Sequence, residues 1–224
     1  MRRNNSRPED YYKQTNNARS PFIACFPTSM INAASTVHIT FPTPAPGSDE
    51  SRYSQPEDRY DAFLHSDIVL KHFENDRDIQ SMIEDDYDYR EIYAVEEWAF
   101  NKWIGKPCCR FINGITKSEI VGIINAGGAI VTSGKFSRFK HVVCIVGYVK
   151  DDHTGELTHI IIDDSYGDPR KDYKPVGVGG NDVELPIDQF WSCTDKGGGN
   201  HFGIVFLPNG VTYQRNSGKY IIMG

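Results

Sequence analysis

The stretch Ala24-Cys25-Phe26-Pro27-Thr28-Ser29-Met30-Ile31-Asn32-Ala33-Ala34 decides the fold. It joins a polar N-terminal arm to an apolar run, and its proline lies in a first turn, where a helix needs no backbone N–H donor. We therefore expect a helix over about 26–37 with Cys25 at its start. The unpaired N–H groups and the helix dipole at that end favour a thiolate over a thiol. The alternative is a small buried side chain, which free cysteine commonly is.

Composition narrows the class of protein. The 224 residues, 39% of them hydrophobic, are enough for one sizeable core. A net charge of −6, a pI near 5.6 and no basic cluster beyond Arg2-Arg3 argue against nucleic-acid or anionic-membrane partners. No apolar run approaches the ~18 residues of a membrane span, and the first residues lack the apolar centre of a signal peptide. We therefore expect synthesis in the cytoplasm and no membrane span.

The five cysteines show neither the spacing of a disulfide framework nor a Cys-x-x-Cys zinc pattern. Reduced thiols are expected, with no cofactor and no metal. The adjacent Cys108 and Cys109 indicate packing rather than a redox pair, because neighbouring cysteines rarely close a relaxed disulfide. Cys144, in the middle of a predicted strand, is expected to be inert.

The order of apolar patterns indicates an α+β protein. Prolines predict that residues 41–58 lie outside regular structure. Apolar residues spaced by three and four over 60–104 predict two or three helices. The charged runs of these helices, such as Glu96-Glu97, are expected to be solvated faces. The remaining expected elements are a strand at 108–115, a helix opened by the capping box at 116–119 and running over 120–126, strands at 129–133, 141–149 and 159–163, a helical turn at 188–191, and strands at 202–207 and 211–222. We expect a single domain, 1–224, in which the N-terminal helix packs on one face of an antiparallel sheet and 38–105 form a loop plus helical insertion.

A thiolate nucleophile needs a base, and seven histidines compete for that role. His141 begins a β-branched strand, so its ring is expected at a strand end, where a cleft can form. Asp163 and Asp164 end the next strand. In an antiparallel hairpin the start of one strand lies beside the end of the other, so an aspartate there can reach His141. Alternation puts the two aspartates on opposite faces, and only one can serve.

Other histidines are weaker candidates. His201 is the main alternative base, but no acid follows it in the sequence. His153 and His159 have aspartates nearby, yet no spacing typical of metal ligands supports a metal site.

Three motifs occur in a fixed order along the chain. They are Cys25-Phe26-Pro27-Thr28-Ser29-Met30 after a glutamine-containing arm, Lys140-His141-Val142-Val143-Cys144-Ile145-Val146-Gly147-Tyr148, and Ile160-Ile161-Ile162-Asp163-Asp164-Ser165-Tyr166-Gly167. Together they resemble the bacteriocin-processing (double-glycine) cysteine peptidases and their phage and bacterial relatives, a family with the papain-like fold. The resemblance covers residues 11–37 and 117–168.

What the resemblance implies is a catalytic triad of Cys25, His141 and Asp164, with an oxyanion-stabilising glutamine before the cysteine. Gln14 fits that last role, although it lies farther from Cys25 than is usual in the family, and Asn17 is the alternative. The family motif has a proline at the position of Ser165.

The activity that the resemblance implies is that of a cysteine peptidase or amidase. A stand-alone relative without a transporter domain is similar to phage and bacterial members that cut cell-wall peptides. We therefore expect a phage endolysin-type peptidoglycan hydrolase, with a peptide or peptidoglycan substrate and action at the cell wall after release. The alternatives are a processing peptidase for a leader or viral protein, and a catalytically inactive papain-like binding module whose partner surface is 38–105. The sequence does not predict the oligomeric state.

Overall fold

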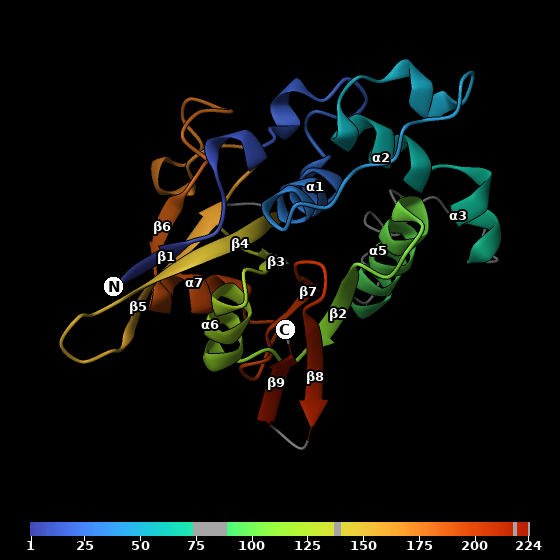
Figure 1. Cartoon of the computed structure of the whole chain (residues 1–224). Helices are drawn as coiled ribbons and strands as arrows, with labels where there is room; N and C mark the ends of the chain where they lie inside the picture. Colours follow the sequence, from blue (N-terminus) through green and yellow to red (C-terminus); the bar gives the residue numbers. More distant parts are fainter. Residues whose placement is uncertain (74–88, 137–139, 217–218, 224) are drawn as a thin grey trace.

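The computed structural model describes residues 1–73, 89–136, 140–216 and 219–223. Figure 1 shows the helices and strands, coloured along the chain. The helices are α1 (Cys25–Thr36), α2 (Pro56–Leu64), α3 (Asp67–His72), α5 (Tyr89–Ile104), α6 (Lys117–Asn125) and α7 (Ile187–Thr194). The strands are β1 (Arg2–Asn4), β2 (Cys109–Asn113), β3 (Ala129–Gly134), β4 (His141–Lys150), β5 (Leu157–Asp163), β6 (Val183–Pro186), β7 (Phe202–Phe206), β8 (Thr212–Asn216) and β9 (Lys219–Met223).

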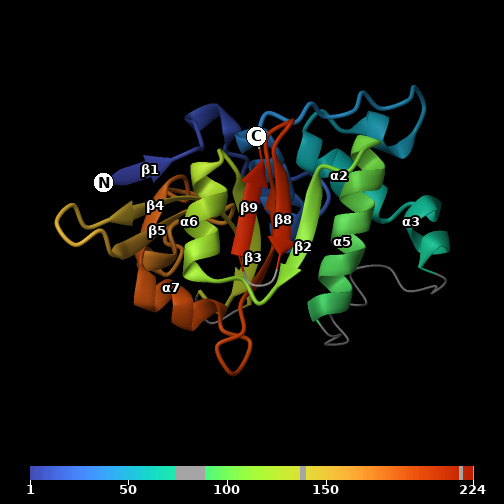
Figure 2. The ribbon, with the colours of Figure 1, turned by 60° about the horizontal axis from the view of Figure 1, so that its bottom comes forward.

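A seven-stranded sheet forms the centre of the protein, and every pairing among its described strands is antiparallel. The strand order is β2-β7-β3-β4-β5-β6. The short strand β1 pairs with β4 at Gly147–Val149, beyond the part of β4 that pairs with β3. Strands β8 and β9 form a separate hairpin beside α6 (Figure 2).

Helices cover both faces of this sheet (Figure 1). The core on one face joins α1, α2 and α5 to the sheet, and the core on the other face joins α6 and α7 to it. Successive residues of β4 alternate between the two cores: Cys144 belongs to the first, and Val143 and Ile145 belong to the second. A strand buried on both faces is continuously apolar, which explains the unbroken β-branched run of this strand.

The expected α+β class is confirmed: the N-terminal helix packs against a mostly antiparallel sheet, and a helical segment is inserted between α1 and β2. The helices α6 and α7 cover the opposite face of the sheet from α1. Two edge strands, β1 and β6, were not predicted: β1 is three polar residues long, and β6 is four residues that end in proline. The strand expected at 211–222 is the hairpin β8–β9.

Within the insertion, α2 begins at Pro56, the first helical position, where proline is favoured. Tyr60 of α2 packs edge-on against Phe100 of α5 at 4.8 Å and lies 5.2 Å from the Trp103 ring. These contacts attach α2 to α5, and both helices share the core of α1. The part of the helical prediction that falls on 74–88 lies outside the described residues.

Candidate active site

Cys25 is the first residue of α1, and its thiol is free and half-buried. One turn later, Ser29 Oγ donates a hydrogen bond of 3.0 Å to the carbonyl oxygen of Val142. Val142 follows His141 at the start of β4. This hydrogen bond therefore links the start of α1, which carries Cys25, to the start of β4, which carries His141.

His141 and Asp164 form a buried pair. His141 Nε2 lies 2.7 Å from Asp164 Oδ1, and the two residues are 8% and 0% exposed. The same carboxylate oxygen accepts the backbone N–H of Tyr166 at 3.0 Å, and Asp164 Oδ2 accepts the Tyr173 hydroxyl at 3.1 Å. Both carboxylate oxygens are thus satisfied, and this holds the orientation in which Asp164 faces the imidazole.

The charge state of His141 follows from these neighbours. Burial lowers its pKa, but the charge and hydrogen bond of Asp164, together with a hydrogen bond to Cys25, outweigh burial and raise the pKa to about 10. Since Nε2 is engaged with Asp164, Nδ1 is the ring nitrogen left for the Cys25 thiol. An imidazolium beside a sulfur can stabilise a thiolate, and nucleophilic catalysis by cysteine uses such an arrangement.

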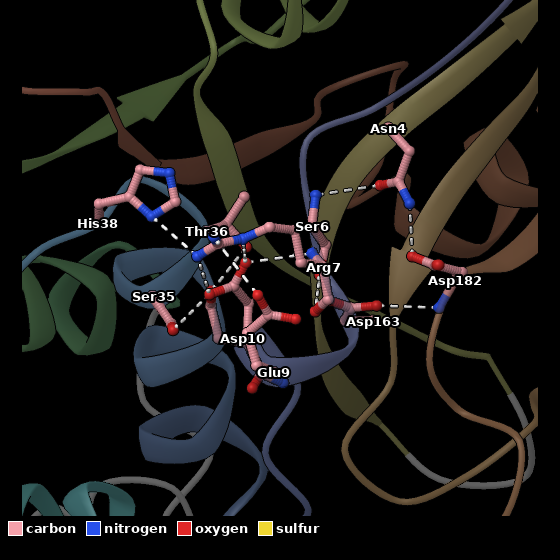
Figure 3. A network of polar contacts seen from close by, with 11 residues as sticks. Asn4, Ser6, Arg7, Glu9, Asp10, Ser35, Thr36, His38, Asp163 and Asp182 are labelled. Atoms are coloured by element: carbon pink, nitrogen blue, oxygen red, sulfur yellow. Dashed lines mark hydrogen bonds and ion pairs between the residues drawn. The ribbon is translucent and has the colours of Figure 1, made fainter.

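Asp163 has different neighbours (Figure 3). Its Oδ2 accepts the Ser6 hydroxyl at 2.8 Å, and its Oδ1 accepts the backbone N–H of Asp182 at 2.9 Å. Burial raises the pKa of this carboxyl to about 7. Of the two candidate aspartates, the structure therefore brings Asp164 to His141, and Asp163 fixes the N-terminal arm to the residues before β6.

The N-terminal arm is a packed part of the protein rather than a solvated tail. Buried Asp10 accepts hydrogen bonds from Ser35 Oγ of α1 at 2.9 Å and from Arg7 Nε at 3.1 Å (Figure 3). Further along, Asn32 of α1 pairs with the backbone of Tyr12 through both ends of its amide. The arm thereby carries Gln14 to the side of the site.

Gln14 is 1% exposed and bridges two segments of the site. Its Nε2 donates to the carbonyl oxygen of Pro21 at 3.3 Å, and its Oε1 accepts the Ser165 hydroxyl at 2.7 Å. Pro21 lies in the loop before Cys25, and Ser165 follows Asp164. The serine that departs from the family motif is thus the residue that anchors the Gln14 amide.

Asn17 has a different arrangement. Its Oδ1 accepts the backbone N–H groups of Arg19 and Ser20 at 2.9 and 2.8 Å, which shapes the turn before α1. Its Nδ2 is buried and has no partner among the described residues. Gln14 and Asn17 each retain an amide hydrogen that a bound oxyanion could accept, so both stay candidates for that role.

The loop between Gln14 and Cys25 is held by the insertion. Asp58 Oδ1 accepts the backbone N–H of Ala18 at 2.8 Å, and Arg19 Nε donates to Asp61 Oδ2 at 2.9 Å. Both aspartates belong to α2 and are at least nine-tenths buried. We call Arg19, Asp58 and Asp61 the loop clamp. The sequence pattern did not indicate these contacts: Asp58 lies in 41–58, which was predicted to be outside regular structure, whereas α2 begins at Pro56.

The expectation of a solvated face is wrong for Glu96. This residue is 0% exposed, and its Oε2 accepts the Tyr60 hydroxyl at 2.7 Å. Burial raises the pKa of its carboxyl to about 8, so it is largely protonated near neutrality and tolerates the apolar surroundings. Glu57 of α2 is also 0% exposed, and burial raises its pKa to about 7.

Two tyrosines of the site were missed by sequence reasoning. Tyr11 donates its hydroxyl to the backbone oxygen of Asp164 at 2.8 Å, and Tyr173 donates to the carboxylate. The Tyr173 ring also lies 5.7 Å from the His141 ring, edge-on. Tyr173 belongs to a loop in which Asp172 and Tyr173 itself adopt left-handed backbone, a conformation that the sequence pattern gave no reason to expect.

The other residues singled out from the sequence lie apart from this cluster. His201 Nδ1 lies 3.0 Å from Thr194 Oγ1, its ring contacts Trp191, and burial lowers its pKa. Cys144 is fully buried in β4, and all five cysteines are free thiols. In the part of the chain that the structure describes, no three metal-ligating side chains come together.

Comparisons of this chain with protein-family models, with curated proteins and with solved structures gave no match. Among the described helices, none has the length and apolar character needed to cross a bilayer.

Proposed function

We propose that this protein is a cysteine peptidase or amidase of the papain-like type, which hydrolyses amide bonds with Cys25 as nucleophile, His141 as base and Asp164 as the residue that orients the base. The observation that carries the proposal is the chain of contacts from the Cys25 thiol to His141 and on to Asp164 at 2.7 Å. A nucleophile, a base within hydrogen-bond reach and a third group that fixes the base are the parts that covalent amide hydrolysis needs.

The proposed reaction has two halves. In the first, the Cys25 thiolate attacks the amide carbonyl carbon, the carbon–nitrogen bond breaks, and His141 gives its proton to the departing amine. In the second, His141 takes a proton from water, and the resulting hydroxide attacks the thioester carbon. The carbon–sulfur bond breaks, the carboxylic acid leaves, and His141 returns the proton to the Cys25 sulfur. The Asp164 carboxylate faces the imidazolium of His141 and stabilises it throughout.

Charge develops on the carbonyl oxygen in both halves. The backbone N–H of Cys25 at the start of α1 is one proposed donor to this oxyanion, because the first N–H groups of a helix have no intrahelical partner. The Gln14 amide is the second proposed donor, and Asn17 is the alternative. Removing one such donor typically lowers kcat by about 10²–10³-fold.

The resemblance in sequence leaves two substrate classes. One is the peptide of the bacterial cell wall, cut by an endolysin-type peptidoglycan hydrolase, and the other is a leader or viral polypeptide. The cell-wall substrate stays a prediction. It is tested by adding the purified protein to a peptidoglycan suspension and measuring whether the suspension clears. Release of new amino groups from that suspension identifies the bond as an amide.

A comparison of two cysteine variants tests the chemistry. Cys25→Ala should abolish amide hydrolysis of a denatured polypeptide and of peptidoglycan, and Cys108→Ala, which removes another half-buried thiol, should keep it. Both variants should unfold at the temperature of the parent protein. If the parent hydrolyses neither substrate and its Cys25 reacts with iodoacetamide no faster than Cys108, the protein is an inactive binding module and the proposal fails.

A further inference from the structure

Exposed apolar side chains gather around the candidate site. The described part of the chain has six large hydrophobic residues that are clearly exposed, and four of them lie in two loops next to the site. These four are Phe22 at 79%, Ile23 at 51%, Val176 at 49% and Val178 at 54%. The other two are Met1, at the N-terminus, and Ile68, in α3. Single exposed apolar residues are ordinary, but a group of them at one place marks a binding surface.

The first loop leads directly into the nucleophile. Phe22 and Ile23 come three and two residues before Cys25. The carbonyl of Pro21, next to Phe22, accepts the Gln14 amide at 3.3 Å. These two apolar side chains therefore belong to the segment that carries the thiol.

The second loop touches the other side of Gln14. The backbone N–H of Gly177, between the two valines, donates to the carbonyl of Tyr166 at 2.8 Å, and the Tyr166 ring lies 6.2 Å from the His141 ring. A Cβ on Gly177 would lie 2.6 Å from Thr15 Oγ1, so this loop lies directly against the residue after Gln14. Only glycine fits there, since the φ of +73° also disfavours other residues.

The Gln14–Thr15 turn thus contacts both loops, and we call the four exposed apolar residues of these loops the apolar rim. The rim is continuous with the candidate site: one part leads to Cys25, and the other is joined to Tyr166 beside His141. A polypeptide whose amide bond lies at Cys25 would carry its neighbouring side chains over this rim.

We propose that the apolar rim binds large apolar side chains next to the bond that is cut, so that the substrate is a polypeptide segment with Leu, Ile, Val, Phe or Met at that place. This inference rests on the proposed function. Cell-wall stem peptides fit the rim poorly, because their side chains are mostly small or ionised and cannot cover four large apolar groups. Burial of such a group against the rim supplies the recognition energy.

The test separates binding from catalysis by using the Cys25→Ala protein. Three fluorescent eight-residue Gly/Ser peptides carry a central Leu-Leu, Ala-Ala or Asp-Asp pair, and a disaccharide-free cell-wall stem peptide is the fourth probe. We expect the Leu-Leu peptide to bind at least about tenfold more tightly than the Ala-Ala peptide. The Asp-Asp and stem peptides should bind more weakly still. Equal affinities for all four probes, or tightest binding of the stem peptide, would overturn the proposal.

Two rim variants and one control complete the experiment. Phe22→Ser and Val178→Ser, each made in the Cys25→Ala protein, should weaken binding of the Leu-Leu peptide severalfold. Ile68→Ser, which removes a side chain of similar exposure in α3, should bind like the parent. If the Leu-Leu peptide binds and the rim variants weaken it but the active protein cleaves nothing, the rim stands and the proposed function fails. If the protein cleaves polypeptides without apolar preference, the function stands and the rim fails.

Discussion

Asp163 and Asp164 are adjacent in the chain, yet their carboxylates belong to different networks. Asp164 Oδ1 lies 2.7 Å from His141 Nε2, and Asp163 accepts the Ser6 hydroxyl at 2.8 Å and the backbone N–H of Asp182 at 2.9 Å. Strand alternation explains the division, since Asp163 ends β5 opposite Cys144 and the next side chain points the other way. Two neighbouring aspartates thus offer a matched pair of variants.

Asp164→Asn should shift the pH profile of the reaction, and Asp163→Asn should not. An amide at 164 keeps an acceptor for His141 but removes the charge that raises the His141 pKa to about 10. The alkaline limb of kcat/KM should therefore move to lower pH in Asp164→Asn, with about a tenfold loss for each unit above the new limb. Asp163→Asn should keep the parent profile. A shift of equal size in both variants would contradict the assignment of Asp164.

The central contact of the site could be predicted because its parts lie on elements with strong patterns. Cys25 starts an apolar helix, and His141 and Asp164 lie at the meeting ends of two consecutive β-branched strands. For two strands joined by a hairpin, sequence order alone fixes which ends meet. No such rule predicts the hydrogen bonds that surround this contact. The Tyr173 hydroxyl donates to Asp164 from an irregular loop, and the Ser165 hydroxyl donates to Gln14, which is distant in the sequence.

The fold was predictable to a similar depth. Long apolar strands and the capping box at Thr116 indicated their elements, and the box is present, with Thr116 Oγ1 accepting the N–H of Glu119 at 3.3 Å. The edge strands β1 and β6 were not predictable, because strands of three or four residues are too short to show a pattern of their own and are specified by the partner strand. The burial of Glu96 was not predicted either, because its hydrogen-bond partner, Tyr60, comes from a distant part of the chain.

Alkylation of Cys25 should depend on His141. With the pKa of His141 near 10, the imidazolium is present throughout the neutral range and should keep the sulfur reactive toward iodoacetamide even at pH 6. His141→Ala should slow the reaction of Cys25 at pH 6 by about tenfold or more, because the stabilising cation is gone. Mass spectrometry of labelled peptides measures this rate, and Cys108 in the same sample is the internal reference. An unchanged Cys25 rate in the variant, with the fold retained, would show that His141 does not activate the thiol.

Glu96→Gln should make the stability of the protein less dependent on pH. The folded-state pKa of Glu96 is about 8, above the ordinary value of 4.5, so between these pH values the folded chain holds a proton that the unfolded chain has released. The contribution of Glu96 to stability therefore falls as pH rises from about 4.5 to 8, by on the order of 5 kcal/mol for a shift of this size. The variant should lack this part of the decline in urea unfolding at pH 5 and pH 8. Glu91→Gln, at an exposed position of the same helix, is the control, and equal slopes in both variants would refute the role of Glu96.

The loop clamp connects the insertion to catalysis. Asp58→Ala removes the acceptor of the Ala18 N–H, and a typical hydrogen bond contributes about 0.5–1.5 kcal/mol to stability. Since that N–H belongs to the loop between Gln14 and Cys25, the freed loop should misplace both residues, and kcat should fall about tenfold or more while KM changes less. Asp67→Ala, at an exposed position of α3, should alter neither constant.

The split between kcat and KM separates positioning from simple destabilisation. Steady-state rates measured well below the unfolding temperature of each variant compare fully folded proteins, so a merely structural role of Asp58 would leave kcat near the parent value. Asp61→Ala is a second test of the same clamp, because it leaves the Ala18 contact intact and removes the 2.9 Å ion pair with Arg19, together with the 3.8 Å contact to His65 Nδ1. A kcat near that of the parent in both Asp58→Ala and Asp61→Ala would mean that α2 anchors the loop without aligning the nucleophile.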